Sequence, residues 1–161
     1  MNYKSLRIYS QNVWKNKNLT EVILETEKKT SNVIFIQEPP RYLTKHIPSP
    51  HNCEGEPIYG HPSHPEWSIL ARPANDQSGI PRAITYINKR LNSLQPMLRR
   101  DVVDHRDINA TSLTINNSPS LLLNVYSDES QSAITHLIDH KINHDKILIM
   151  AGDFNIRVSC S

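Results

Sequence analysis

The sequence has few cysteines, no long apolar run and no strong excess of one charge, and each absence excludes a class of protein. Its two cysteines, Cys53 and Cys160, form neither a metal-binding motif nor a disulfide framework, which favours a reducing, intracellular compartment. No apolar run is long enough to span a bilayer, so we expect no membrane segment. The chain begins directly with a predicted strand, so we expect no signal peptide. The formal net charge of +2 does not by itself indicate a nucleic-acid partner.

The length and composition fit one folded domain. A chain of 161 residues can bury a core, and 37% hydrophobic with 21% charged residues is typical of a globular rather than a disordered chain. The sequence contains no internal repeats or low-complexity tracts. We therefore treat residues 1–161 as a single domain.

The rest of the chain is organised around residues 147–155, which read Ile-Leu-Ile-Met-Ala-Gly-Asp-Phe-Asn. The apolar run predicts a buried strand that stops at Gly152. Asp153 and Asn155 are two residues apart, so an extended chain can point both side chains the same way. A carboxylate beside an amide can hold a polar, anionic or metal-bound ligand. The alternative is an Asx turn that closes the strand.

Residues 6–13 and 33–38 predict two further strands that end in polar side chains. Asn12 shares a face with the apolar residues of the first strand, although it could instead only close the strand or cap the next turn. The second strand is apolar on both faces and should be central and buried. Glu38 has the parity of Ile34 and Ile36, and a carboxylate in that inward row is costly unless paired or metal-bound. The alternative is an exposed glutamate before two prolines.

Residues 121–126 predict a strand on which Leu122, Asn124 and Tyr126 share one face. The alternative for Tyr126 is a packed ring with a hydrated hydroxyl. Residues 67–71, 83–87 and 108–115 predict more strands, with turns at residues 75–79 and 116–119.

Two helices are predicted between these strands. Asn18 is expected to cap the first, with Glu21 at the capping-box position. Asp128 is expected to cap the second, which has one apolar face at helical spacing. That face consists of Ala133, Ile134, Leu137, Ile138 and Ile142.

Histidines occur in three places where a metal or catalytic role can be considered. His136, His140 and His144 form an i, i+4 row that could bind a metal or simply lie on the polar face of the helix. His105 stands near Asp107, which invites a general-base hypothesis. Residues 39–65 carry four histidines and seven of the eleven prolines, too long a stretch for an ordinary connection, so we expect a substrate-facing loop. No cysteine–histidine spacing there supports a metal cluster.

Residues 82–106 are rich in basic side chains, with Asp101 and Asp104 as the opposing charges. The basic residues are Arg82, Lys89, Arg90, Arg99, Arg100 and Arg106. The segment could follow a phosphate backbone, or it could be a solvated basic loop.

The motif Gly152-Asp153-Phe154-Asn155 resembles the Gly-Asp-Phe-Asn motif of the endonuclease/exonuclease/phosphatase superfamily. Earlier strand ends resemble the other motifs of that superfamily in the same order: Gln11-Asn12, Gln37-Glu38 and Asn124-Val125-Tyr126. The local sequence of residues 86–90 and 124–128 looks most like that of fungal LINE-type retrotransposon endonuclease domains. The resemblance implies an α/β fold, a two-layer β-sandwich of mostly antiparallel strands flanked by helices.

The resemblance implies a divalent-metal-dependent endonuclease that nicks DNA, located in the nucleus if derived from a retroelement. Phosphodiester hydrolysis needs charge neutralisation at the phosphate and an activated water, which a hard cation such as Mg²⁺ or Mn²⁺ supplies. The implied metal ligands are Glu38 and Asn12. The implied catalytic residues are Asp153 for the water, Tyr126 for the phosphate, Asn155 for the phosphate or the base machinery, and Asn12 for metal and phosphate.

The chain departs from the superfamily at its C-terminal end, because the superfamily continues with strands and a catalytic Asp-His pair. We therefore expect missing C-terminal strands, impaired activity and an unpaired sheet edge that favours association. The alternative is a non-catalytic remnant that binds nucleic acid or a partner chain. A phosphatase acting on a small substrate is also possible, because a fold alone does not define the substrate.

Overall fold

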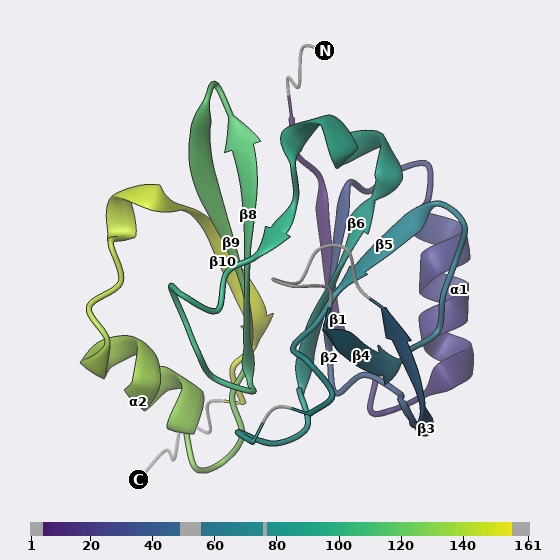
Figure 1. The fold of residues 1–161 in the computed structure, drawn as a ribbon, viewed down its shortest axis with the longest axis horizontal. Helices are drawn as coiled ribbons and strands as arrows, with labels where there is room; N and C mark the ends of the chain where they lie inside the picture. The colour runs from purple at the N-terminus through teal and green to yellow at the C-terminus, as the bar shows by residue number, and fades with distance from the viewer. Residues whose placement is uncertain (1–4, 49–55, 76, 156–161) are drawn as a thin grey trace, which may run out of the picture.

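The computed structural model describes residues 5–48, 56–75 and 77–155, arranged in layers (Figure 1). Two four-stranded sheets face each other, with α1 (Lys17–Glu27) outside the first and α2 (Ser132–Asp139) outside the second. Cys53 and Cys160 lie outside the described residues. No described helix has both the length and the apolar character needed to cross a membrane.

The first sheet has the strand order β1-β2-β6-β5. Its strands are β1 (Ile8–Asn12), β2 (Val33–Gln37), β6 (Ala83–Asn88) and β5 (Trp67–Leu70). β1 and β2 are parallel and joined through α1, whereas the other pairs are antiparallel. Every residue of β2 and β6 is buried, as expected for central strands that are apolar on both faces.

The second sheet has the strand order β10-β9-β8-β7. Its strands are β10 (Ile147–Asp153), β9 (Ser118–Tyr126), β8 (Ile108–Ile115) and β7 (Met97–Leu98). β9 and β10 are parallel across α2, and the other pairs are antiparallel. Short 3₁₀ helices, η2 (Lys89–Leu94) and η3 (His144–Lys146), precede β7 and β10.

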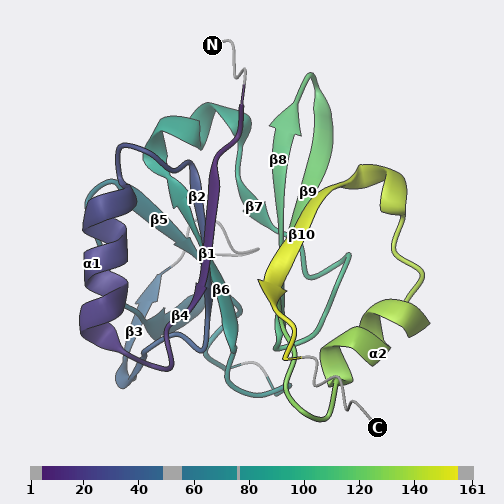
Figure 2. The ribbon, with the colours of Figure 1, turned by 180° about the vertical axis from the view of Figure 1, so that it is seen from behind.

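One apolar core lies between the two sheets, as predicted for the strands around residues 6, 33, 121 and 147. Val33 and Phe35 of β2 pack in it with Leu122 of β9, and Ile149 and Ala151 of β10 lie against it. Figure 2 shows β1 and β10 facing each other across this core. The predicted α/β sandwich of mostly antiparallel strands is therefore present.

The predicted caps of both helices are wrong by a few residues. Asn16, not Asn18, caps α1, because its side-chain oxygen accepts a hydrogen bond from the amide of Leu19 at 3.0 Å. α2 begins after Gln131, which makes no side-chain cap, while Asp128 accepts from the Ser130 amide one turn earlier. The apolar face of α2 is only partly realised, since Ala133 is buried but Ile138 is 73% exposed.

The proline-rich segment is not only a loop, which corrects the prediction for residues 39–65. It contains β3 (Tyr42–Pro48) and β4 (Pro57–Gly60), which pair as a separate antiparallel ribbon with Pro48 opposite Pro57. Proline is tolerated there because both strands of a two-stranded sheet are edge strands. Residues 49–55, including His51, lie outside the described part of the chain.

The prediction of a buried strand at residues 147–155 is wrong. β10 is the last strand of its sheet, and exposed residues alternate along it, with Leu148 53% and Met150 39% exposed. An apolar run cannot by itself distinguish a central strand from an edge strand, because that depends on which neighbour the strand finds.

Candidate active site

Asn12 and Glu38 meet at the carboxyl ends of the parallel strands β1 and β2. Two backbone hydrogen bonds tie the strand ends together, from the Val13 amide to the Gln37 carbonyl and from the Lys15 amide to the Glu38 carbonyl. Glu38 has a left-handed backbone, with φ of 49°. This turn breaks the strand alternation, so Glu38 does not continue the row of Ile34 and Ile36, which packs on the α1 side.

Asp153 and Tyr126 are register partners at the carboxyl ends of β10 and β9. Gly152 precedes Asp153, and a β-carbon there would lie 1.8 Å from the Val125 carbonyl oxygen. Only glycine therefore allows β10 to approach β9 this closely. The Ser127 amide bonds the Asp153 carbonyl at 2.8 Å and closes the end of the pair.

The side chain of Asn12 joins the two sheets at this end. Its Nδ2 donates to Oε2 of Glu38 at 2.9 Å and to Oδ2 of Asp153 at 2.8 Å. Its Oδ1 accepts from the Trp14 amide at 2.9 Å, which holds the amide plane in place. Two carboxylates from different sheets therefore converge on one nitrogen. The sequence predicted that these three residues lie together, but not this arrangement.

The two carboxylates have no cationic partner among the described residues. The nearby cation Arg82 is already paired, with Asp107 at 2.5 and 2.6 Å and with Asp128 at 2.8 Å. These bonds to Asp107 above all, and also to Asp128, raise the Arg82 pKa. The cluster of Glu38 and Asp153 is therefore an uncompensated pair of negative charges that would attract a cation.

Tyr126 lies beside this pair, as predicted. Burial raises the pKa of its hydroxyl, and the negative charge of Glu38 raises it further, which keeps the phenol protonated. The Arg82 guanidinium lies 4.9 Å from the centre of the Tyr126 ring and fixes its face. Arg82 was noticed in the sequence only as one member of a basic segment, because its partners Asp107 and Asp128 are distant in the chain.

Asn155 lies at the margin of the site. Its amide donates to Oδ1 of Asp153 at 3.3 Å, which is the Asx turn considered as the alternative for this motif. Its Nδ2 donates to the Ser127 carbonyl at 3.0 Å. The turn and the site thus coexist, because the turn uses one oxygen of Asp153 and Asn12 uses the other.

The donors at this site suit a hard cation such as Mg²⁺ or Mn²⁺, since they are carboxylate oxygens. Asn12 turns its nitrogen, not its oxygen, toward them, so its observed contact positions the carboxylates. Within the described residues, no group of three His, Cys, Asp or Glu side chains is arranged to hold a metal. The metal and catalytic roles of these residues stay predictions.

A buried polar layer behind the site was not predicted. Gln37, 1% exposed, donates to Oδ1 of Asn124 at 2.7 Å and to Ser10 at 3.1 Å. Asn124 in turn donates to the carbonyls of Ile36 and Ile84 in the opposite sheet. These bonds hold the two sheets in register next to the carboxylates. The sequence feature that could have indicated this layer is an amide side chain in each of two otherwise apolar runs, Gln37 in one and Asn124 in the other.

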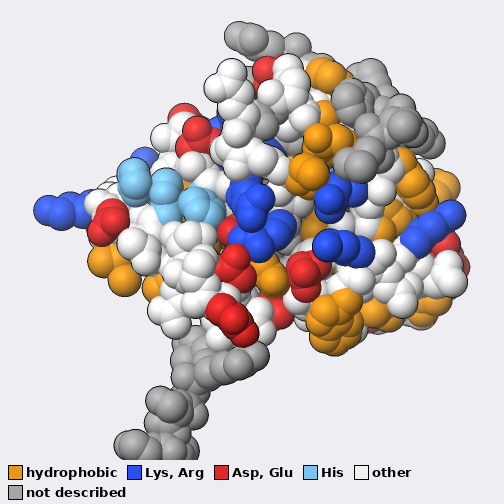
Figure 3. All heavy atoms as spheres, turned by 90° about the horizontal axis from the view of Figure 1, so that it is seen from below, with side chains coloured by type: hydrophobic (Ala, Val, Ile, Leu, Met, Phe, Trp, Pro, Cys, Tyr) orange, Lys and Arg blue, Asp and Glu red, His pale blue; other side chains and the backbone are white. Residues whose placement is uncertain are grey.

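No histidine side chain that the structure describes contacts the two carboxylates. His105, His136 and His140 form a row of rings, with centroid separations of 5.0 and 3.8 Å. Figure 3 shows histidine side chains gathered in a row next to a group of Lys and Arg side chains. Burial lowers the pKa values of His105 and His136. Among the described residues, Glu38 and Asp153 have no histidine partner. The side chain of His144 lies outside the described part of the structure.

Most basic side chains of residues 82–106 are paired with groups of the protein itself. Four of its arginines lie within ion-pairing distance of carboxylates: Arg82, Arg99, Arg100 and Arg106. Arg90 donates to the carbonyls of Lys28 and Ser31. This leaves little of the segment's charge for phosphates.

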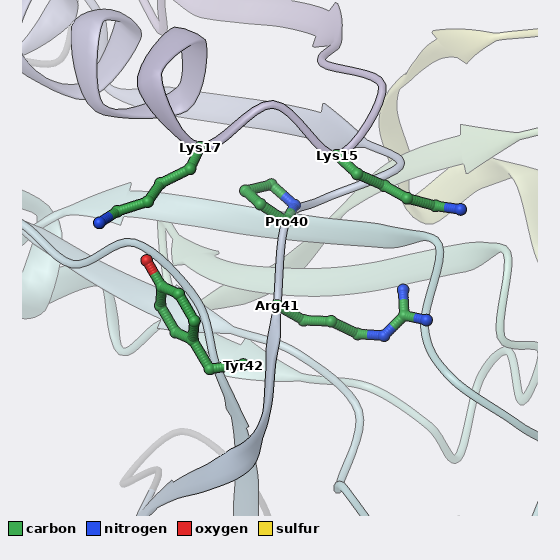
Figure 4. A pocket seen from close by; sticks show the side chains of 5 residues that line it. All are labelled: Lys15, Lys17, Pro40, Arg41 and Tyr42. Atoms are coloured by element: carbon green, nitrogen blue, oxygen red, sulfur yellow. The ribbon is translucent and has the colours of Figure 1, made fainter.

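A different basic surface adjoins the carboxylates and was not predicted. A pocket of about 360 Å³ is lined by Lys15, Lys17, Pro40, Arg41 and Tyr42 (Figure 4). Its two walls continue directly from the site, one following Asn12 and the other following Glu38. In the sequence, Lys15 and Lys17 follow Asn12 closely, and Arg41 follows Glu38. That these two segments lie side by side is evident only from the structure, where the Lys15 amide bonds the Glu38 carbonyl.

Comparisons with known proteins indicate the fold. No protein-family model matches the chain, and no curated protein matches it. The structure is similar to the endonuclease domain of TRAS1, a telomere-specific non-LTR retrotransposon, with a TM-score of 0.57 and 15% identity. The match covers 94% of this chain but 61% of that one, so this chain spans less than two thirds of the neighbour's length. At this identity the likeness shows that the two share a fold.

Proposed function

We propose that this chain is a nuclease of the endonuclease/exonuclease/phosphatase type that nicks DNA with the help of a divalent cation. One observation carries the proposal. Glu38 and Asp153, from different sheets, meet at the amide of Asn12 without a compensating cation in the described structure. The fold shared with a retrotransposon endonuclease domain supports a nucleic acid as the partner. DNA as that nucleic acid, and the nucleus as the location, belong to the proposal.

The proposed division of roles follows from the contacts. A bound Mg²⁺ or Mn²⁺ would neutralise phosphate charge and lower the pKa of a water. Glu38 and Asp153 would hold the cation, and Asp153 would also orient the water. Asn12 would keep the two carboxylates at a constant separation, and with its amide turned over, its oxygen would bind the metal.

Tyr126 and Asn155 would bind the phosphate in this scheme. The Tyr126 hydroxyl stays protonated and can donate to a phosphate oxygen, because burial and the charge of Glu38 raise its pKa. Arg82 would act by holding the Tyr126 ring, since its guanidinium is committed to Asp107 and Asp128. Asn155 would contact the phosphate only after releasing the Ser127 carbonyl.

Metal binding tests the proposal directly. Calorimetry with Mg²⁺ and Mn²⁺ should show binding that weakens at least about tenfold in Glu38→Gln and in Asp153→Asn, since a neutral amide replaces an ionic oxygen ligand. Asp145→Asn, which changes an exposed carboxylate of η3, is the matched control. Equal affinity in wild type and both site variants would remove the metal role.

Plasmid nicking tests the reaction itself. We expect the wild type to nick DNA slowly in Mg²⁺, because general acid–base assistance is worth about 10²–10⁴ in rate and no described histidine reaches the carboxylates. Asp153→Asn should abolish this nicking. Nicking that persists in Asp153→Asn would contradict the proposal. Nicking lost in His105→Ala would reassign the proton transfer to His105.

A second candidate is a non-catalytic protein that binds nucleic acid or a partner chain. The observation in its favour is that Asn12 satisfies one oxygen of each carboxylate. DNA binding that is unchanged by EDTA, together with no nicking in Mg²⁺, would select this candidate.

A further inference from the structure

The pocket beside the carboxylates has the chemistry of a phosphate-binding groove. Lys15 and Arg41 extend to the same side of Pro40, whereas Lys17 and the Tyr42 hydroxyl lie on the other side (Figure 4). Lys17 is partly compensated by Glu21 at 3.5 Å. Among the described residues, Lys15 and Arg41 have no carboxylate partner, and the buried Nε of Arg41 has no hydrogen-bond partner. Two cations are therefore available to an anion.

The walls of the groove are held rigidly. The Lys15 amide bonds the Glu38 carbonyl at 2.8 Å, and the Asn16 amide bonds the Val13 carbonyl at 2.8 Å. On the other wall, buried His61 donates through Nδ1 to the Pro40 carbonyl at 2.8 Å. A preorganised site loses less entropy on binding than a mobile one.

Trp14 lies in the sequence between Asn12 of the candidate site and Lys15 of the groove, and its side chain is 70% exposed. Its backbone is left-handed, with φ of 46°, and that of Lys15 follows with φ of 58°. Such a conformation costs about 1 kcal/mol or more per non-glycine residue, so it persists only where the surroundings impose it. The contact of its amide with Oδ1 of Asn12 is one such restraint. The chain thus holds a large apolar ring in solvent two residues after Asn12 of the candidate site.

We propose that this surface recognises an unpaired nucleotide next to the cleaved bond, with Lys15 and Arg41 on its phosphate and Trp14 stacked on its base. The proposal rests on the proposed function for nucleic acid as the ligand. A base inside a duplex has both faces covered by its neighbours, so an exposed indole can stack only on a base that has left the stack. The two cations favour a nucleic acid over an apolar protein partner. The protein therefore prefers DNA with a locally unpaired base.

Equilibrium binding in EDTA, where no cleavage occurs, tests this preference. Fluorescence anisotropy compares a labelled duplex with a central unpaired base and its fully paired counterpart. Wild type should favour the unpaired DNA, and Trp14→Ala should weaken that binding by about five- to a hundredfold while leaving the paired duplex unchanged. Trp14→Phe should retain most of the preference, because a phenyl ring still stacks.

The charge contacts should behave differently from the ring. Lys15→Ala and Arg41→Ala should each weaken binding to both DNAs and reduce the salt dependence by about one phosphate contact. Lys29→Ala, an exposed lysine beyond the opposite end of α1, and Met97→Ala, an exposed apolar residue elsewhere, are the matched controls. Both controls should bind like wild type.

Intrinsic fluorescence supplies a second readout, because the chain has only two tryptophans. Trp67 is 3% exposed and donates through its indole nitrogen to the Leu24 carbonyl, so it reports folding. Unpaired DNA should quench Trp14 alone. An unchanged Trp67 signal in Trp14→Ala confirms that the variant is folded.

The proposal is overturned if Trp14→Ala keeps the preference of wild type, or if wild type binds no DNA in EDTA. Its failure is separable from that of the proposed function. Trp14-dependent binding without nicking in Mg²⁺ leaves this inference standing and removes the nuclease. Nicking that requires Asp153 but not Trp14, together with no Trp14-dependent preference in binding, supports the nuclease and removes this inference.

Discussion

The two strands that deliver the carboxylates, β2 and β10, differ in almost every respect. All five residues of β2 are buried between two neighbouring strands, whereas β10 is the end strand of its sheet and is exposed at alternate positions. The position of Glu38 is therefore set by the core. That of Asp153 depends on one neighbour, β9, and on the amide of Asn12. The candidate site thus joins a rigid half to a half that can be displaced at lower cost.

The largest difference between the halves should appear on truncation of their side chains. Phe35→Ala on β2 should cost about 3–5 kcal/mol, because it removes a fully buried ring and leaves a cavity. Met150→Ala on β10 should cost less than about 1 kcal/mol, because that side chain is already 39% exposed. Urea denaturation measures both. Equal losses would mean that the two strands are equally embedded.

Acid should loosen the β2 side of the site through His61. Burial lowers the pKa of His61 from 6.5 to about 4, so between these values the unfolded chain takes up a proton that the folded chain does not. Stability should fall as the pH falls through this window, by up to about 3 kcal/mol at 1.36 kcal/mol per pKa unit.

His61→Asn is the matched variant for this effect, because an asparagine amide can still donate toward the Pro40 carbonyl but does not titrate. Denaturation midpoints across the window should show a steeper loss in wild type than in the variant. Parallel curves would mean that other groups carry the acid sensitivity.

The attachment of β10 to β9 should depend on Gly152. Gly152→Ala places a β-carbon 1.8 Å from the Val125 carbonyl oxygen, so the strand must shift, at a cost of about 1–3 kcal/mol. Because Asp153 follows, the affinity for Mg²⁺ should also fall. Met150→Ala on the same strand should leave that affinity unchanged. Intact metal binding in Gly152→Ala would show that Asn12 alone positions Asp153.

The smallest effect on stability is expected at the outer side of β10. Met150→Lys should change the free energy of unfolding by no more than about 0.5 kcal/mol, because the side chain already meets solvent. We expect an edge strand carrying exposed Leu148 and Met150 to favour association, and a lysine there to oppose it. Sedimentation at increasing concentration should show less association in Met150→Lys than in wild type. Identical behaviour would exclude this edge as the contact.

Several features were predictable from local sequence alone. Apolar runs located β1, β2, β6, β8, β9 and β10 to within a few residues, because burial of alternating or continuous apolar side chains is a local requirement of a strand. A polar residue at the end of such a run marked Asn12, Glu38, Tyr126 and Asp153 as candidates. These side chains do lie together.

The remaining features depend on neighbours that are distant in the sequence. Asn12 and Asp153 are separated by 141 positions, and no local pattern states that one amide serves both Glu38 and Asp153. The left-handed turn at Glu38 overrode the strand parity, and the pairing of Arg82 with Asp107 and Asp128 removed it from the available cations.

The sequence by itself therefore determined which segments form strands and which polar groups end them, since these follow from the properties of each segment. Only the tertiary structure decided that β10 is an edge strand and that basic side chains of residues 82–106 pair with carboxylates of the protein. It also decided that Lys15 and Arg41 line one groove next to the candidate site. The solvent exposure of a strand and the ion pairing of a charged side chain both depend on which other segments pack against them. They are settled only when strands from opposite ends of the chain become neighbours.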